Sequence, residues 1–316
     1  MSTAPVSIGI DVAKGELVVA TPVAEIGRMG NDPAGIRDLV ESLRPLVVDR
    51  VTLESTGCYG RAVAAALLAA GYRVAVVQPG RVRHFAASIG IRAKTDPIDA
   101  KVIARFAEAT QPRTMTPPAE AVARMRALVD RRDQLLDMRI QEENRLETIT
   151  DPLIAREVRG QVARLRRMEE RYTKHIAETI AADPELRALS DRLQEESGVG
   201  LQTTAVLLAY FPELGHLNRQ RAAALAGLAP YDRSSGTYDG KRAIFGGRKR
   251  LRRALYFAAV TAVRWNPRLK DTYRALRTRG KVPKVALIAC ARKLLVRLNS
   301  LAADVLTTQG KVLLSP

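Results

Sequence analysis

The sequence predicts an α/β domain followed by an all-α remainder, and three observations support this division. Short apolar runs alternate with helical patterns up to about residue 110, and the middle of the chain carries narrow apolar stripes on charged helices. The last third is helical in pattern and strongly basic. We therefore expect three domains within the 316 residues, at 1–115, 116–189 and 190–316.

The first domain begins with two apolar runs, at 6–12 and 17–23, which predict a β-hairpin turning at Lys14 and Gly15. The following elements are expected in this order: a helix from Asp32 to Leu43, a strand at 50–53, an Ala-rich helix ending at Gly71, a strand at 72–77, a basic helix at 81–87 and a helix at 96–109. A hairpin followed by alternating strands and helices fits a mixed sheet flanked by helices. This is the element order of a ribonuclease-H-like domain.

Four acidic residues stand at element ends in this domain. Asp11 and Glu54 close two apolar runs, whereas Asp96 and Asp99 open a helix with Pro97 in its first turn. Two strands and one helix can bring these carboxylates to one point. At ~4 Å and an effective dielectric constant of ~20, each like-charged pair costs roughly 4 kcal/mol, so the cluster needs protons or divalent cations. The pattern predicts an Mg²⁺ site for phosphodiester chemistry.

Each acid also has a structural explanation when it is taken alone. Asp96 before Pro97 is a good N-cap, and Asp99 suits the positive end of a helix dipole. Asp11 at a strand end can be a turn residue. The prediction of a metal site therefore depends on the combination of all four acids in this order.

The composition points to a polyanionic partner. Lys and Arg number 51 against 33 acids, which gives a net charge of +18 and a pI near 10.4. A membrane surface is the other option, but no apolar stretch approaches the ~20 residues of a span. Cys58 and Cys290 lie far apart without a zinc-like cluster, and the N-terminus does not resemble a signal peptide. We expect a protein of the bacterial cytoplasm, associated with the nucleoid.

The middle domain is predicted to be a coiled-coil helical hairpin broken at Asp151 and Pro152. Its apolar stripe comprises Val122, Met125, Val129, Leu136 and Ile140, and then Val158, Val162, Leu165, Met168, Tyr172, Ile176 and Ile180. A helix pair that folds only on itself is one reading of this stripe. A stripe of this length favours the other reading, association with a second chain.

The last domain begins with a glycine turn, Gly198-Val199-Gly200, which opens an apolar helix. This resembles a helix-hairpin-helix element, whose glycine amides can hold a DNA phosphate without reading bases. An ordinary interhelical turn is the alternative.

A Ser-Ser-Gly loop and a basic run follow. Repulsion among its cations suggests that phosphates neutralise them, so the run predicts a nucleic-acid surface. The cations are Lys241, Arg242, Arg248, Lys249, Arg250, Arg252 and Arg253. A serine in this loop could attack phosphorus beside guanidinium donors, although such a loop alone is usually a plain turn.

Together these motifs resemble the DEDD-type, RuvC-like insertion-sequence transposases of the IS-one-ten family, known as bridge-RNA-guided recombinases. The resemblance rests on GIDVAK at Asp11, LESTG at Glu54, KTDPIDA at Asp96 and Asp99, and the GLAP…RSSG…LRRALY block. It implies that Ser235, directly before the glycine, is the catalytic serine.

The resemblance also implies partners and a reaction. Such proteins form homodimers that assemble into tetramers on a noncoding bridge RNA, which pairs with donor and target DNA. Ser235 would form a phosphoserine–DNA link, with Mg²⁺ held by the four acids. The alternatives are a Mg²⁺-dependent junction endonuclease without a covalent intermediate, and a non-catalytic basic scaffold for RNA and DNA.

Overall fold

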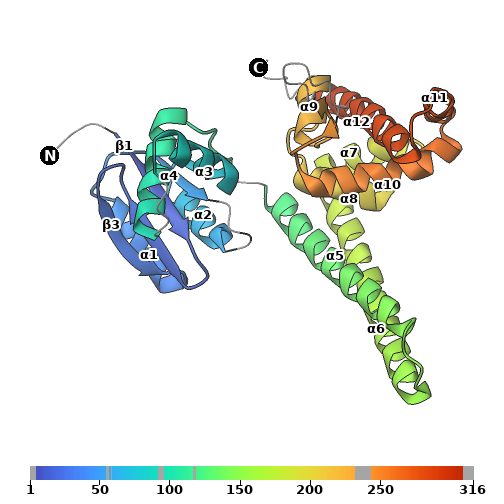
Figure 1. Cartoon of the computed structure of the whole chain (residues 1–316), viewed down its shortest axis with the longest axis horizontal. Helices are drawn as coiled ribbons and strands as arrows, with labels where there is room; N and C mark the ends of the chain where they lie inside the picture. Colours follow the sequence, from blue (N-terminus) through green and yellow to red (C-terminus); the bar gives the residue numbers. More distant parts are fainter. Residues whose placement is uncertain are drawn as a thin grey trace. The chain divides into compact units, whose positions relative to one another are not determined.

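A computed structural model of the chain describes residues 5–54, 57, 59–91, 96–116, 119–231 and 243–308, without the side chains of 96–98. It divides into two compact units, 1–117 and 118–316 (Figure 1). Because α7 (Pro184–Gln194) spans the boundary predicted at 189/190, the hairpin and the C-terminal helices form one unit.

Unit 1 contains a five-stranded mixed sheet in the order β3-β2-β1-β4-β5. Its elements are β1 (Val6–Val12), β2 (Glu16–Ala20), β3 (Glu25–Gly30), α1 (Pro33–Leu43), β4 (Val48–Glu54), α2 (Gly60–Ala69), β5 (Val74–Val77), α3 (Pro79–Ser88) and α4 (Asp96–Thr110). The first three strands are antiparallel, and β4 and β5 run parallel to β1. The mixed sheet is confirmed, and the sequence reading missed only β3, which lies at the sheet edge and has no buried residue.

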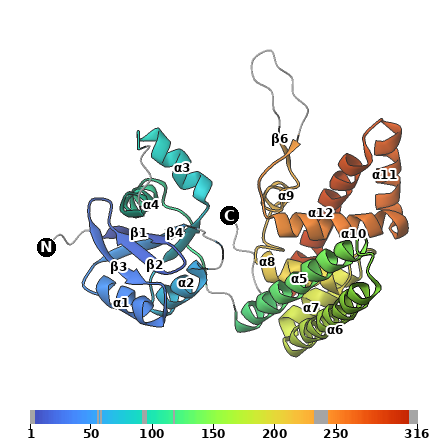
Figure 2. The ribbon, with the colours of Figure 1, turned by 60° about the horizontal axis from the view of Figure 1, so that its bottom comes forward.

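Helices cover both faces of this sheet (Figure 2). On one face, Ile8, Ile10 and Leu53 pack into a core with α1 and α2. Asp32 caps α1 as predicted, because its side chain accepts hydrogen bonds from the amides of Ala34 and Gly35, each at 2.9 Å. The other face carries α4, which contacts β1, β2 and β4 and packs against α3.

The backbone of α4 lies directly on β1 at Gly9. A Cβ atom built on Gly9 would stand 2.2 Å from the carbonyl oxygen of Ala100 and 2.4 Å from the amide nitrogen of Ala104. Both contacts are with backbone, so no side chain can move aside. Gly9 therefore permits the observed separation of sheet and helix.

In its described residues, unit 2 is helical apart from one small antiparallel ribbon. Its elements are α5 (Glu120–Leu146), α6 (Pro152–Ala182), α7, α8 (Leu201–Tyr210), α9 (Arg219–Leu225), β6 (Pro230–Tyr231), β7 (Ala243–Ile244), α10 (Lys249–Trp265), α11 (Pro267–Thr278) and α12 (Pro283–Thr308). The ribbon and α11 were not foreseen: the strands have only two residues each, and Pro267 starts a mostly polar helix.

The predicted helical hairpin is present as α5 and α6, which pack along each other (Figure 1). Met125, Val129, Ile176 and Ile180 join the main core of unit 2. The register differs slightly from the prediction, because Leu135 is fully buried whereas Leu136 is half-buried. Among the described residues, no helix has the length and apolar character needed to cross a membrane.

We expect Gly9→Ala to separate α4 from β1. Overpacking of this kind costs ~1–3 kcal/mol, and because both clashing atoms are backbone we expect the upper end of that range. Amide hydrogen exchange of peptides from β1 and α4 should therefore accelerate roughly 100-fold.

Gly80→Ala is the matched control, since a Cβ there meets nothing within 4 Å and a helical alanine stabilises by up to ~1 kcal/mol. If the amide hydrogen exchange rates of β1 and α4 were unchanged in the Gly9→Ala protein, the packing of α4 on β1 would not require a glycine at this position.

Candidate active site

Asp11 and Glu54 lie at neighbouring ends of two parallel strands. In the register of β1 and β4, Ile10 pairs with Leu53, so the acids occupy the next position on each strand. Neighbouring strands are ~4.8 Å apart. Because Ile10 and Leu53 face the core under α1 and α2, and side chains alternate along a strand, both carboxylates are on the face covered by α4.

The first turns of α4 bring the third acid to this face. Asp99 directly precedes Ala100, the residue whose carbonyl approaches Gly9, and Gly9 is two positions before Asp11 on the same strand face. All three carboxylates are partly exposed. The register thus places Asp11 and Glu54 on adjacent strands at matching positions, and Asp99 stands in the first turn of the helix that covers their face.

Thr52 adds a second observation at this position. It pairs with Gly9 in the register, its side chain is fully buried, and its hydroxyl has no hydrogen-bond partner among the described residues. An unsatisfied buried hydroxyl costs ~1–3 kcal/mol, and a functional role or a bound ion or water is among the explanations for such a group.

The side chain of Asp96 lies outside the described part of the structure. Within that part, no group of three or more His, Cys, Asp or Glu side chains is arranged to hold a metal ion. The donor types suit Mg²⁺, which prefers carboxylate oxygens, and the fourth predicted ligand is the undescribed one. The metal site formed by the four acids stays a prediction.

The segment that contains Ser235 is flanked by a two-stranded ribbon, and close backbone contacts hold the residues next to this ribbon. The ribbon of β6 and β7 brackets residues 232–242, and Ser235, Lys241 and Arg242 lie outside the described residues. Below the ribbon, a Cβ on Gly247 would be 2.2 Å from the amide nitrogen of Gly227. Arg252 adds to these contacts by donating to the carbonyl oxygens of Gly227 at 3.2 Å and Gly246 at 2.8 Å.

Several cations of the basic run have intramolecular partners. Arg248 forms a bidentate ion pair with Glu213, with both N–O distances at 2.7 Å, and lies over the ring of Phe211. Arg250 pairs with Asp130 and, at 3.1 Å, with Asp133. The prediction that phosphates neutralise this run is therefore wrong for Arg248 and Arg250, which acids of the same unit neutralise.

The other described cations of the run, Arg252, Arg253 and Lys249, also differ in whether they have an intramolecular partner. Arg252 donates hydrogen bonds below the ribbon. Arg253 is exposed, and its ion pair with Asp137 at 3.7 Å is a surface pair that contributes little to stability. Lys249 is exposed. Arg253 and Lys249, together with the undescribed Lys241 and Arg242, stay predicted nucleic-acid contacts.

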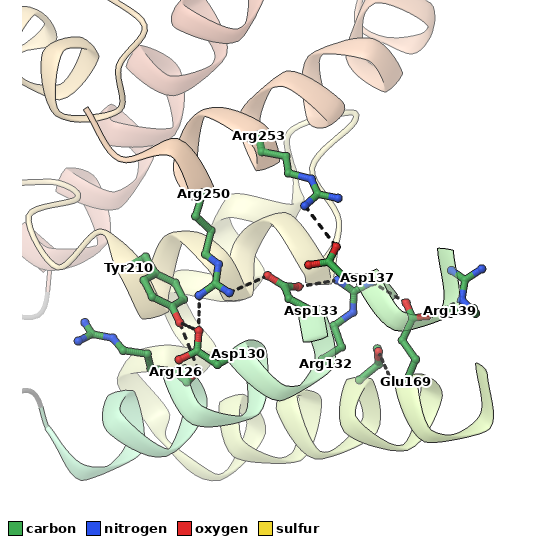
Figure 3. Close-up of polar contacts among 11 residues, drawn as sticks. Arg126, Asp130, Arg132, Asp133, Asp137, Arg139, Glu169, Tyr210, Arg250 and Arg253 are labelled. Atoms are coloured by element: carbon green, nitrogen blue, oxygen red, sulfur yellow. Dashed lines mark hydrogen bonds and ion pairs between the residues drawn. The ribbon is translucent and has the colours of Figure 1, made fainter. Parts of the chain in front are cut away.

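The acids that pair with arginines of α10 form a network that was not predicted from the sequence (Figure 3). Asp130, Asp133 and Asp137 project from one face of α5, at spacings of three and four, toward Arg250 and Arg253 at a spacing of three on α10. Burial and a hydrogen bond to Asp130 raise the pKa of Tyr210 on α8 well above its usual value. These complementary spacings are the signal that could have revealed the pairing.

The two glycines of the predicted helix-hairpin-helix element differ in role. Gly198 has φ +94° and its Cβ would meet the Cα of Ala262 on α10 at 2.6 Å. Gly200 is the N-cap of α8, is exposed, and has nothing within 4 Å of a built Cβ. Gly198 therefore serves helix packing, whereas Gly200 leaves the amino end of α8 accessible to an anion.

We expect Gly198→Ala to destabilise unit 2 by ~1–3 kcal/mol, through left-handed strain and the contact with Ala262. Gly200→Ala should change stability by less than ~1 kcal/mol yet weaken DNA binding severalfold, because its methyl group stands where a phosphate would approach.

Chemical unfolding and a DNA titration of both proteins test this pair. If the Gly200→Ala protein bound DNA as tightly as the wild type, the turn would be a packing element only.

Two transposase family models match this chain. A family model of the DEDD transposases of IS110, described as a transposase, matches residues 8–153. A second model, described as the Transposase IS116/IS110/IS902 family, matches residues 190–274. The first range includes all four acids, and the second includes Gly198, Gly200 and Ser235.

Curated relatives extend the similarity over most of the chain. A pilin gene-inverting protein of Moraxella bovis is 27% identical over 302 residues, covering 91% of this chain and 92% of its own. The protein of the same description from Moraxella lacunata is 28% identical over 250 residues, covering 77% and 76%. An uncharacterized 43.6 kDa protein of insertion element IS110 from Streptomyces coelicolor is 36% identical over 127 residues, covering 38% and 30%.

Proposed function

Because this chain belongs to the IS110 family of insertion-sequence transposases and is a DNA transposase or recombinase, we propose that it exchanges DNA strands through a covalent Ser235–DNA intermediate. The observation that carries the proposal is the anchored ribbon. A base of close glycine contacts and Arg252 holds β6 and β7 on either side of the segment that contains Ser235.

The proposed exchange conserves one phosphate ester at each step. The Ser235 oxygen bonds to phosphorus and loses its proton, while the bond from phosphorus to one DNA oxygen breaks and that oxygen is protonated. A hydroxyl of the second DNA strand then reverses these steps and releases the serine. No nucleotide cofactor is required, and the name of the Moraxella relatives, which describes inversion of a gene, fits such exchange.

Asp11, Glu54, Asp96 and Asp99 would hold Mg²⁺ in this proposal. The ion would stabilise charge on the scissile phosphate and the departing oxygen. The strand order of unit 1, with β1 central and β4 parallel to it, supports a ribonuclease-H-like or RuvC-like assignment. In this proposal, the register of β1 and β4 and the contact at Gly9 would help to bring the carboxylates together.

The family resemblance further supports a bridge RNA and assembly of homodimers into a tetramer on DNA at the bacterial nucleoid. Apolar side chains exposed on the outer half of the hairpin are consistent with a partner chain. They are Met138, Ile140, Leu153 and Ile154, with 37–56% of their surface exposed.

The second candidate is a Mg²⁺-dependent DNA junction endonuclease that uses activated water. The observation in its favour is that the acids all lie in unit 1, which is a compact unit with its own core. Such an enzyme would need no serine.

Ser235→Ala is expected to abolish covalent protein–DNA adducts, because alanine offers no oxygen to phosphorus. Labelled donor DNA is incubated with Mg²⁺ and the full-length protein, and adducts are counted on a denaturing gel. Ser234→Ala is the matched control and should retain adducts.

Cleaved DNA without any adduct in the wild type would favour the junction endonuclease. Adducts that persist in the Ser235→Ala protein would exclude Ser235 as the nucleophile.

A further inference from the structure

A second concentration of positive charge in unit 2 follows the basic run described above. Between Arg264 and Lys284 the sequence holds eight cations and one acid, Asp271, for a net charge of +7. This segment includes the end of α10, all of α11 and the start of α12, which contact one another (Figure 1).

Residues of these three helices line an open groove of about 540 Å³. Half-buried Val260, Val263 and Leu287 supply an apolar floor, and Tyr273 on α11 is half-buried beside them. Arg264, Lys270 and Arg274 form the cationic rim. The groove therefore combines an aromatic ring, an apolar surface and three cations.

The rim cations differ from those at the start of α10. Among the residues that the structure describes, Arg264, Lys270 and Arg274 have no ion-pair partner, whereas Arg248 has one and Arg250 has two. Asp271 is the one acid in this segment, so most of the positive charge is not compensated there, costs stability through repulsion and would be relieved by phosphates.

The size and the chemistry of the groove favour an unpaired strand over a duplex. Its volume falls within the ~300–1,000 Å³ of pockets that hold single small molecules. Proteins bind unpaired strands by placing bases on aromatic rings and phosphates along cations. A duplex hides its base faces in the stack and would leave Tyr273 and the apolar floor unused.

Exposed aromatic side chains continue the surface. Phe257 stands three and seven residues before Val260 and Arg264, so it lies on the same face of α10, and it is 58% exposed. Trp265 at the end of α10 is 74% exposed. Large exposed aromatic side chains beside a basic groove indicate an interaction surface.

We propose that the groove between α10, α11 and α12 binds an unpaired DNA strand, with bases on Tyr273 and phosphates on Arg264, Lys270 and Arg274. The proposal relies on the proposed function only for the kind of nucleic acid, since the strand released by cleavage is DNA. Duplex DNA and RNA are the other occupants that the experiment distinguishes.

The test is a fluorescence anisotropy titration of the full-length protein, without Mg²⁺, using labelled dT20, U20 and a 20-base-pair duplex. Tyr273→Leu should weaken dT20 binding about five- to 100-fold, because stacking on an aromatic ring is lost. Tyr273→Phe keeps the ring and should bind like the wild type. Since no strand is cut in this assay, its result does not depend on whether Ser235 is the nucleophile.

The rim is tested by salt dependence. Arg264→Gln and Arg274→Gln should each lower the slope of log affinity against log salt by ~0.7, the value per phosphate contact for a single strand. Lys174→Gln, an exposed cation on α6, should leave the slope for dT20 unchanged.

Thermal melting verifies that each variant is folded. Equal dT20 affinity of the Tyr273→Leu and wild-type proteins would overturn the proposal. So would a loss confined to the duplex or to U20, which would assign the groove to those ligands.

Discussion

Gly9 has no side chain, and the backbone of α4 occupies the space that a Cβ atom would need. This contact sets the distance between the helix and the central strand of the sheet. The parallel register then places Asp11 beside Glu54, and Asp99 stands in the first turn of the helix that covers their face. Like-charged carboxylates at ~4 Å repel by roughly 4 kcal/mol per pair, so a cluster of this kind needs a counter-ion. The proposed metal chemistry depends on this one packing constraint.

A second constraint operates in unit 2, where α5 and α10 are joined by charge. Asp130 and Asp133 pair with Arg250, close to the point where the chain leaves the serine ribbon. Arg248 and Glu213 tie the same point to the segment after α8. The N-terminal half of α5 and the segment that follows β7 are therefore held together within this unit. The proposed association through the hairpin and the proposed chemistry at the ribbon would therefore share one frame.

Local patterns were sufficient to predict much of the fold. Asp32 capping α1, Pro152 opening α6 and the alternating apolar runs of β1 and β2 each follow from neighbouring residues, and all three are observed. The partners of Arg248 and Arg250 could not be read from neighbours, because Glu213 lies 35 and Asp130 lies 120 residues away. The same holds for Gly9, whose importance appears only when Ala100 is packed on it. Edge strand β3 lacks the buried residues that make a strand visible in sequence.

The central claim, that Asp11, Glu54 and the start of α4 surround one metal ion, can be measured directly by iron-mediated cleavage. Fe²⁺ bound in place of Mg²⁺ produces hydroxyl radicals with ascorbate and peroxide, and these cut the nearby backbone. We predict cuts near Asp11, near Glu54 and near residues 96–99 of the full-length protein, all of which disappear with excess Mg²⁺ and in the Asp11→Asn protein. Cuts at only one of these segments, or cuts that survive in the Asp11→Asn protein, would contradict a shared metal site.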